Sequence, residues 1–336
     1  MPDPQLRENV THVRLEDVAV SARVSTATVS RALRGDTRIS ERTRVRVVEL
    51  AAALGYVPDA AARTLATRQS HTFGLLIPDV TDPLHGQVVT GFEQAAAAAG
   101  FGVLLAGGMY DVARERRAAA AFRAHRVAGM AILGGVLEQA EAVKGESGQV
   151  VALLNGEHPA LAETGDLPEG CIRSDDGPGI EALVHHLAGE GHRRLAYLEG
   201  PAIASNVIRR AAVERAAGHL GLPRPVRLMH QAAGPAEVAT AGFDAVVCYD
   251  DKSALSLIDG LRAAGLSVPR DLAVAGFDDI PFARLYNPRL TTVAQPSEAV
   301  GRHAVAMLLA GLESGRLQPT QHLPVQLIAR ESSLRA

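Results

Sequence analysis

The chain contains few cysteine, lysine and aromatic residues. Cys171 and Cys248 are the only cysteines among 336 residues, too few for a disulfide framework or a cysteine-based zinc cluster. No apolar run reaches the roughly 18 residues that a membrane-spanning helix needs. The first residues, MPDPQLRENVTHVRLEDV, lack the apolar core of a secretory signal. The sequence therefore predicts a cytoplasmic globular protein that does not bind a membrane.

Charge is divided unevenly along the chain. The formal net charge is −3, from 34 basic and 37 acidic side chains, which excludes a protein that coats nucleic acid through bulk charge. Up to Ser70 there are eleven arginines and eight acidic residues, net +3, and the remainder carries −6. All basic residues are arginine except Lys144 and Lys252. A small basic head on a larger acidic body predicts two regions with different partners.

Three short helices are predicted in the head. Apolar side chains recur at helical spacing, and Ser25 and Ser40 are suitable N-caps, which predicts helices over 15–22, 26–33 and 41–54. We expect the third helix to turn four apolar residues inward: Val45, Val48, Ala52 and Leu54. Two helices separated by three residues and closed by a third form the helix-turn-helix layout. Periodicity alone leaves a plain helical bundle as an alternative.

The second predicted helix carries a face of short polar side chains and one arginine: Thr26, Ala27, Thr28, Ser30 and Arg31. Short side chains allow a close approach to the major groove, where an arginine can bind guanine O6 and N7 together. Residues 56–70 then predict a helix too short to be stable alone. This segment is either a linker with helical tendency or a helix that folds on DNA and inserts Leu65 into the minor groove.

The body alternates apolar strands with helices. Strands are predicted in two series, over 72–77, 102–106, 129–133 and 149–154, and over 194–199, 244–248 and 272–276. Two βαβ sets predict an α/β body of two Rossmann-like subdomains, whose ligands bind at the carboxyl ends of the strands. The sequence has no nucleophile elbow, dinucleotide-binding loop or metal cluster. We therefore expect no cofactor, no metal and no enzymatic activity.

The head closely resembles the DNA-binding head of the LacI/GalR family of bacterial transcriptional regulators. The resemblance is carried by VSTATVSR (24–31), GYVP (55–58) and ARTL (62–65), and it continues through nearly the whole chain. It implies an all-α helix-turn-helix head with a hinge helix, and a body similar to periplasmic binding proteins. The implied boundaries are 1–57 for the DNA-binding domain, 58–71 for the hinge and 72–336 for the ligand-binding domain. Within the body, an N-subdomain spans about 72–172 and 296–322, and a C-subdomain about 173–294 and 324–336.

The resemblance also implies roles for single residues in DNA binding. Thr26, Ala27 and Arg31 fall at base-reading positions, where Ala27 can offer only an apolar contact. Thr28 and Ser30 fall at phosphate-contacting positions. Arg63 and Leu65 match the hinge helix, with Leu65 as the minor-groove wedge.

For the ligand, the resemblance implies a cleft between the subdomains. Arg209 and Asp278 match the usual polar anchors of the family, and Leu84 and His85 match cleft-lining positions that are often aromatic. The remaining candidates follow predicted strands or open a helix: Asn155, Asn206, Tyr249 and Asp250. A guanidinium with carboxylates suits a ligand rich in hydroxyls, or one that mixes carboxylate and hydroxyl groups. Because the chain has no tryptophan, stacking on a sugar face falls to Tyr249, Phe282 or Tyr286.

These features predict a homodimeric regulator, a repressor, that binds a palindromic operator under control of a sugar-like effector. The sequence leaves open whether the effector releases DNA or promotes binding. Two other classes share the body fold. An exported solute-binding protein would need a leader segment and no helix-turn-helix, and an α/β enzyme would need a catalytic motif that the chain lacks.

Overall fold

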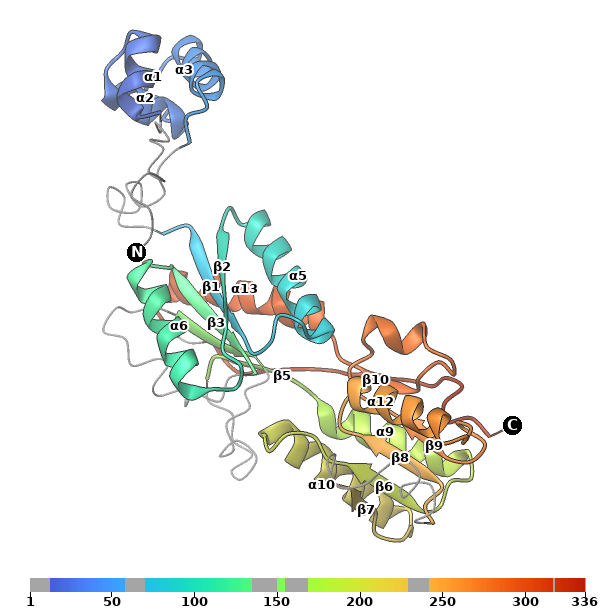
Figure 1. Ribbon diagram of the computed structural model, residues 1–336. Helices are drawn as coiled ribbons and strands as arrows, with labels where there is room; N and C mark the ends of the chain where they lie inside the picture. Colours follow the sequence, from blue (N-terminus) through green and yellow to red (C-terminus); the bar gives the residue numbers. More distant parts are fainter. Residues whose placement is uncertain are drawn as a thin grey trace, which may run out of the picture. The chain divides into compact units, whose positions relative to one another are not determined.

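A computed structural model describes residues 13–57, 70–134, 150–154, 169–228, 242–316 and 318–335, with backbone alone for 150–154. The chain divides into two compact units, 1–69 and 70–336, here called the head and the body (Figure 1). No helix of the described ranges is long and apolar enough to cross a membrane.

The head is a bundle of three helices, α1 (Leu15–Ala22), α2 (Thr26–Leu33) and α3 (Glu41–Ala53). Ser25 Oγ accepts a hydrogen bond from the Thr28 amide at 3.2 Å, which caps the start of α2. Ser40 caps α3 in the same way. The three helices pack around a small buried core: Val18, Ala19, Ala22, Val29, Ala32, Val47 and Ala51.

The prediction of which face of α3 points into the core is wrong. Val45 and Val48 are 44% and 47% exposed, whereas Val47 and Ala51 are buried. Apolar residues occur on every side of this helix, so two faces satisfy helical spacing equally well. Packing against α1 and α2 selects the face, and the Arg46 guanidinium fixes it by donating a hydrogen bond of 2.8 Å to the carbonyl oxygen of Ala22. Ala52 and Leu54 are exposed as well.

The first part of the body is a six-stranded parallel sheet in the order β11-β5-β4-β3-β1-β2. Its strands are β1 (Thr72–Ile77), β2 (Gly102–Gly107), β3 (Gly129–Leu133), β4 (Val150–Leu154), β5 (Cys171–Ser174) and β11 (Gln321–Leu323). Helices α5 (Pro83–Ala98) and α13 (Ser297–Ser314) cover one face, and α6 (Val112–Ala124) covers the other (Figure 1). Strand side chains alternate accordingly, since Phe73 and Leu75 join the α5–α13 core and Leu76 joins the α6 core.

Two glycines let α5 and α13 pack in direct backbone contact. A Cβ at Gly91 would overlap the carbonyl oxygen of Glu298, and a Cβ at Gly301 would overlap that of Val88. Both positions are buried. Any side chain at either site would push the helices apart and open the core beneath them.

The second part is a four-stranded parallel sheet in the order β7-β6-β8-β9. Its strands are β6 (Leu195–Leu198), β7 (Val226–Leu228), β8 (Ala245–Cys248) and β9 (Ala273–Ala275). Helices α9 (Asp176–Gly189) and α10 (Ala204–His219) cover one face, and α12 (Asp251–Ala263) covers the other. A short 3-10 helix, η1 (Pro281–Arg284), follows β9.

Three segments connect the two sheets. The chain leaves the six-stranded sheet at β5 and enters α9, returns after β10 (Thr292–Ala294) into α13, and leaves again between β11 and β12 (Gln326–Ile328). β10 and β12 pair antiparallel beside the four-stranded sheet. The head is therefore all-α and the body α/β with two parallel sheets, as predicted. Of the predicted hinge, only Ser70 and His71 lie within the described residues.

Candidate functional site

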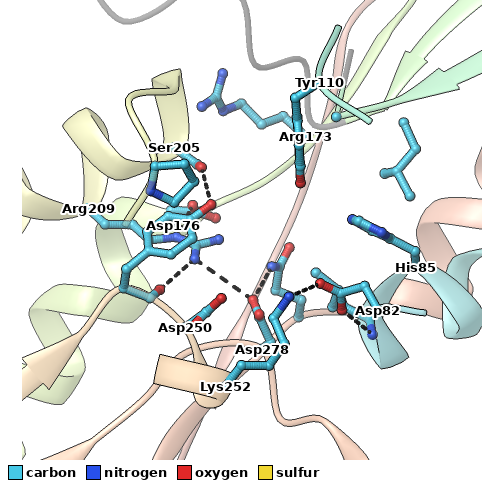
Figure 2. A pocket seen from close by; sticks show the side chains of 16 residues that line it. Asp82, His85, Tyr110, Arg173, Asp176, Ser205, Arg209, Asp250, Lys252 and Asp278 are labelled. Carbon is cyan, nitrogen blue, oxygen red and sulfur yellow. Dashed lines mark hydrogen bonds and ion pairs between the residues drawn. The ribbon is translucent and has the colours of Figure 1, made fainter. Parts of the chain in front are cut away.

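A polar pocket of about 170 Å³ lies at the carboxyl ends of the strands of both sheets (Figure 2). Strand order reverses between β1 and β3 in one sheet and between β6 and β8 in the other. Loops at such reversals diverge to opposite faces and leave a crevice, which is where open α/β sheets bind ligands. Six predicted residues line the pocket: Leu84, His85, Arg209, Tyr249, Asp250 and Asp278.

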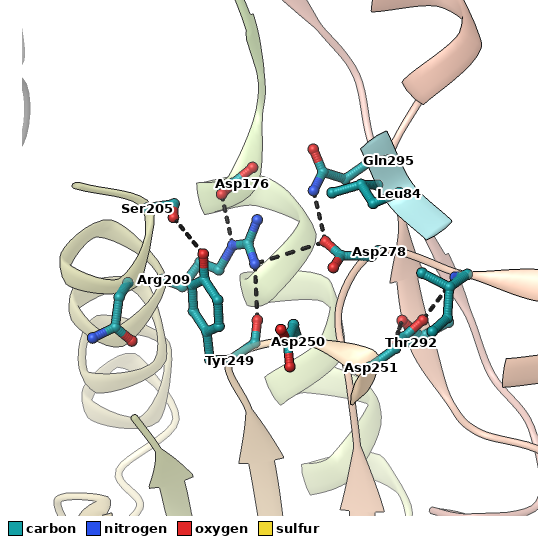
Figure 3. A network of polar contacts seen from close by, with 12 residues as sticks. Leu84, Asp176, Ser205, Arg209, Tyr249, Asp250, Asp251, Asp278, Thr292 and Gln295 are labelled. Carbon is teal, nitrogen blue, oxygen red and sulfur yellow. Dashed lines mark hydrogen bonds and ion pairs between the residues drawn. The ribbon is translucent and has the colours of Figure 1, made fainter. Parts of the chain in front are cut away.

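Arg209 is the centre of a buried network (Figure 3). It lies on α10 at 5% exposure, and its Nε donates to Asp176 Oδ2 at 2.8 Å. Its Nη1 donates to the carbonyl oxygen of Tyr249 at 2.8 Å and lies 3.8 Å from Asp278 Oδ1. The guanidinium also lies over the ring of Phe277, 3.8 Å from its centroid. Its position is therefore fixed from several sides before any ligand binds.

Asp278 is held by a strained turn after β9. Asp278 and Asp279 have φ of 119° and 53°, in the left-handed region that costs energy for residues other than glycine. The Asp278 amide donates to the carbonyl oxygen of Val293 at 2.8 Å, and Gln295 Nε2 donates to Asp278 Oδ1 at 2.7 Å. Burial raises the pKa of Asp278 well above its ordinary value, although the Arg209 charge opposes the shift. The turn thus aims a buried carboxyl group at the pocket.

Two neighbouring aspartates begin α12 with different tasks. Asp250 lines the pocket and caps the helix by accepting from the Ser253 amide at 2.7 Å. Asp251 is fully buried behind it and accepts from Thr292 Oγ1 at 2.6 Å and from the Ile280 amide at 2.9 Å. Burial raises the pKa of Asp251 to about 7 despite those two hydrogen bonds. Asp251 therefore ties α12 to β10 and η1, and Asp250 faces the ligand space.

An ion pair joins the two sides of the pocket. Asp82 caps α5 by accepting from the Leu84 amide, and it also pairs with Lys252 on α12. α5 packs on the six-stranded sheet and α12 on the four-stranded sheet, so this pair bridges the two parts of the body. Burial opposes the charge of Lys252, but the Asp82 carboxylate outweighs it and raises the lysine pKa.

His85 and Tyr249 border opposite sides of the pocket. His85 Nδ1 lies 2.7 Å from the carbonyl oxygen of Asp79, which can only accept, so Nδ1 carries the proton and Nε2 is left for the pocket. The hydroxyls of Tyr249 and Ser205 are 2.9 Å apart. The Tyr249 ring lies against Gly200, where a Cβ would overlap the ring, so this tyrosine needs a glycine in the loop after β6.

One predicted ligand residue, Asn206, does not line the pocket. Asn206 is buried, and its Oδ1 accepts from the Tyr197 hydroxyl and the Gly200 amide, each at 3.0 Å. Its Nδ2 donates to Glu199, so its amide shapes the loop after β6. Asn155 lies outside the described residues. Of the predicted stacking residues, Tyr249 lines the pocket, whereas Phe282 and Tyr286 do not.

Sequence reasoning missed several pocket residues, foremost Asp82, Tyr110, Arg173, Asp176 and Lys252. Two of them had a readable signal. Arg173 is a charged residue inside the apolar strand CIRS, and Lys252 is one of only two lysines and follows the predicted site residue Asp250 directly. Asp176 had none, because its partner Arg209 is 33 residues away and meets it only after folding.

The predicted DNA-contacting face lies on α2. Thr26, Ala27 and Arg31 are exposed, and Thr28 and Ser30 are half-buried. Thr28 Oγ1 lies 2.9 Å from Ser25 Oγ, so this hydroxyl takes part in the helix cap. Arg63 and Leu65 lie outside the described residues. All eight described arginines of the head are exposed or half-buried.

Comparison with known proteins decides the family. A family model described as bacterial regulatory proteins, lacI family, matches residues 14–59, and one described as a periplasmic binding protein-like domain matches residues 184–333. The HTH-type transcriptional regulator GalR of Escherichia coli strain K12 is 31% identical over 311 residues, which cover 88% of both chains. The chain belongs to the lacI family of bacterial regulatory proteins.

Solved structures agree with this family over nearly the full length. A crystal structure of the Lac repressor dimer bound to operator and the anti-inducer ONPF matches with a TM-score of 0.85 and 26% identity, covering 96% of this chain and all of that one. A complex of the transcriptional regulator CelR with cellobiose matches with a TM-score of 0.68, at the same identity and coverage. The predicted fold class is confirmed. The chain is a transcriptional regulator, as predicted, and not an enzyme.

Proposed function

We propose that the chain is a cytoplasmic, homodimeric repressor that binds a near-palindromic operator. A sugar-like effector bound in the pocket sets its operator affinity. The observation that carries this proposal is the pocket itself, because both sheets contribute its lining and a preformed network around Arg209 stands at its centre. A ligand there contacts two parts of the body at once.

The head supports sequence-specific DNA binding. Its reading face combines an exposed arginine with short side chains, Thr26 and Ala27, that allow α2 to enter a major groove. We assign base contacts to Thr26, Ala27 and Arg31 and phosphate contacts to Thr28 and Ser30. We assign Arg63 and Leu65, in the proposed hinge of residues 58–71, to the minor groove.

The body supports pairing of two chains. Phe282 on η1 and Leu285 after it are 54% and 74% exposed, although both are large and apolar. Two large exposed apolar side chains so close in the sequence are candidates for a contact with another chain. The matching Lac repressor structure is a dimer on its operator. Two heads related by a two-fold axis read two half-sites, which is why we expect an inverted repeat.

The lining chemistry supports a hydroxyl-rich effector. Carboxylates of Asp250 and Asp278 accept hydrogen bonds from hydroxyl groups, and Gln295 and His85 add further polar atoms. CelR, a structural relative, is solved with cellobiose. We assign ligand contacts to Leu84, His85, Arg209, Tyr249, Asp250 and Asp278, with Asn155 as a further candidate and Asn206 as a residue that positions the loop.

The same geometry supplies a route from ligand to DNA. A ligand that contacts both sides of the pocket more strongly in one relative arrangement shifts the body toward that arrangement. The proposed hinges leave the body at Ser70 in each chain of a dimer, so a change in their separation alters how two heads fit one operator.

The test is selection of DNA from a random library by the full chain, followed by mobility-shift titration of the selected sequence. We expect an inverted repeat, bound as a dimer, with weaker binding by Arg31→Ala and by Leu65→Ala. Both variants binding as tightly as the wild type would refute the assignment of the DNA site. Arg224→Ala, at an exposed position of the body, is the matched control.

A further inference from the structure

One cation of the pocket has no partner within the described ranges. Arg173 lies on β5 at 9% exposure and lines the pocket. The two other pocket cations are paired, Arg209 with Asp176 and Lys252 with Asp82. In the part of the chain that the structure describes, no hydrogen bond or ion pair joins the side chain of Arg173 to another residue.

The strand places this guanidinium at the ligand end of the sheet. The pairing of β4 with β5 ends at Leu154 beside Ile172, so Arg173 stands one residue beyond it, at the carboxyl end. On its other side Arg173 pairs with His322 of β11. Figure 2 shows Arg173 with Tyr110 along one border of the pocket, and Asp176 with Arg209 along another.

A buried guanidinium whose side chain has no partner among the described residues calls for an anion. Arginine stays charged at any physiological pH, so it cannot escape burial by losing its proton. Taking a charge out of water is unfavourable unless another charge or several hydrogen bonds replace the water. The planar fork of the guanidinium matches a carboxylate or a phosphate, each of which accepts two parallel hydrogen bonds.

We propose that the effector is a small polyol with one anionic group, a carboxylate or a phosphate monoester, and that this group pairs with Arg173. The proposal rests on the proposed function, because it names the ligand of the same pocket. Asp250 and Asp278 bind hydroxyls of that ligand. The cavity of about 170 Å³ is below the roughly 300–1,000 Å³ of pockets for drug-sized ligands, which favours a single sugar unit.

The experiment is a thermal-shift titration of the full chain with matched probes. Glucose, galactose, ribose and xylose are each compared with their aldonates and with their terminal phosphate esters, and acetate and inorganic phosphate serve as anions without hydroxyls. We expect an aldonate or a phosphate ester to raise Tm where its neutral parent and the bare anion do not. Which of the two does so distinguishes a carboxylate from a phosphate.

Substitution of Arg173 tests the contact itself. Arg173→Gln removes the charge at similar length, and we expect the anionic probe to bind at least about 30-fold more weakly, since it leaves the ligand's charge buried and unpaired. Arg173→Lys keeps the charge, and we expect its affinity for the anionic probe to lie between those of the wild type and Arg173→Gln. The ligand-free Tm of Arg173→Gln, expected at or above that of the wild type, separates lost binding from lost folding. Arg224→Gln, an exposed arginine with 79% of its side chain accessible, is the control without effect.

Three results overturn the proposal: a neutral sugar that stabilises as well as its acid, wild-type affinity in Arg173→Gln, or no stabilisation by any acid or phosphate ester. Operator binding is measured on the same preparations. A chain that binds operator but fails these tests refutes the anionic effector alone. A chain that binds no operator refutes the proposed function.

Discussion

Arginine is used in opposite ways in the head and in the pocket of the body. The eight described arginines of the head are all exposed or half-buried, on and between the helices that surround a core made of valine and alanine. In the body, Arg173 and Arg209 are buried at 9% and 5% exposure and line the pocket. An exposed guanidinium suits a large polyanion that arrives from solvent, and a buried one suits a small ligand that enters a fixed site.

The total charge of −3 hides a difference between the two regions. The head carries +3 and the body −6, so the acidic body hides a basic head in the average. The small excess on the head implies that specificity depends on groove contacts and on dimer geometry more than on bulk charge. The following predictions test this division of labour, beginning with the largest effect.

Arg209→Ala is expected to lower the free energy of unfolding of the full chain by about 3–5 kcal/mol, because it leaves Asp176 buried without its cation. Urea denaturation measures the loss. Arg31→Ala on the head is the counterpart, expected within about 0.5 kcal/mol of the wild type because its side chain is exposed. Equal losses of unfolding free energy in the two variants would contradict the contrast between buried and exposed arginines.

Arg31→Ala is expected to weaken operator binding by about 5- to 150-fold, the range for loss of one bidentate contact to guanine. Fluorescence anisotropy with the selected operator measures it, and exchange of the base pair that Arg31 reads should then cost the variant nothing further. Effector affinity of the same variant stays at the wild-type level. A variant that discriminates between the base pairs as well as the wild type contradicts the assignment.

Stability is expected to fall as pH rises from 6 to 8, through the titration of Asp251. Its folded-state pKa of about 7 lies above the unfolded value, so the folded state holds the proton more tightly and loses that advantage as the pH increases. The change is about 1 kcal/mol over this range. Asp251→Asn should flatten the profile in urea titrations at each pH, and an unchanged slope would remove Asp251 as its source.

Asp82→Asn is expected to lower stability by less than about 1 kcal/mol, because the side chain of its partner Lys252 is 49% exposed. The pair bridges the two sides of the pocket, so its loss should weaken effector binding a few-fold even though the fold is intact. Calorimetric titration with the probe that stabilises the wild type measures this. A large loss of stability with unchanged binding would assign the pair a purely structural role.

The sequence predicted the framework better than the contacts. Seven of the ten described strands of the two sheets follow from apolar runs, whereas β5, β7 and β11, which are short and carry polar or charged residues, were not predicted. The helix caps Ser25 and Ser40 follow from local side-chain chemistry. The prediction of the inner face of α3 was wrong because apolar residues occur on every side of that helix, and only tertiary packing selects which of them are buried. Within the site, matching positions placed Arg209 and Asp278 in the pocket.

Partners distant in the sequence were beyond the reach of sequence reasoning. Asp176 meets Arg209 and Asp82 meets Lys252 only when separate segments fold together, and no local pattern encodes either pair. Asn206 occupies the expected helix, yet its amide turns to Tyr197 and Glu199 because buried polar groups there need partners. Position along a helix was predictable, and the direction of a side chain was not.

The most direct test of the account is an operator-binding isotherm with and without the stabilising probe, for the wild type, Arg31→Ala and Asp278→Ala. We predict that the probe shifts the wild-type isotherm, that Arg31→Ala binds operator weakly while its Tm still responds to the probe, and that Asp278→Ala binds operator like the wild type without responding. A probe response in Asp278→Ala equal to that of the wild type, or tight operator binding by Arg31→Ala, would contradict the division between a reading head and a ligand-binding body.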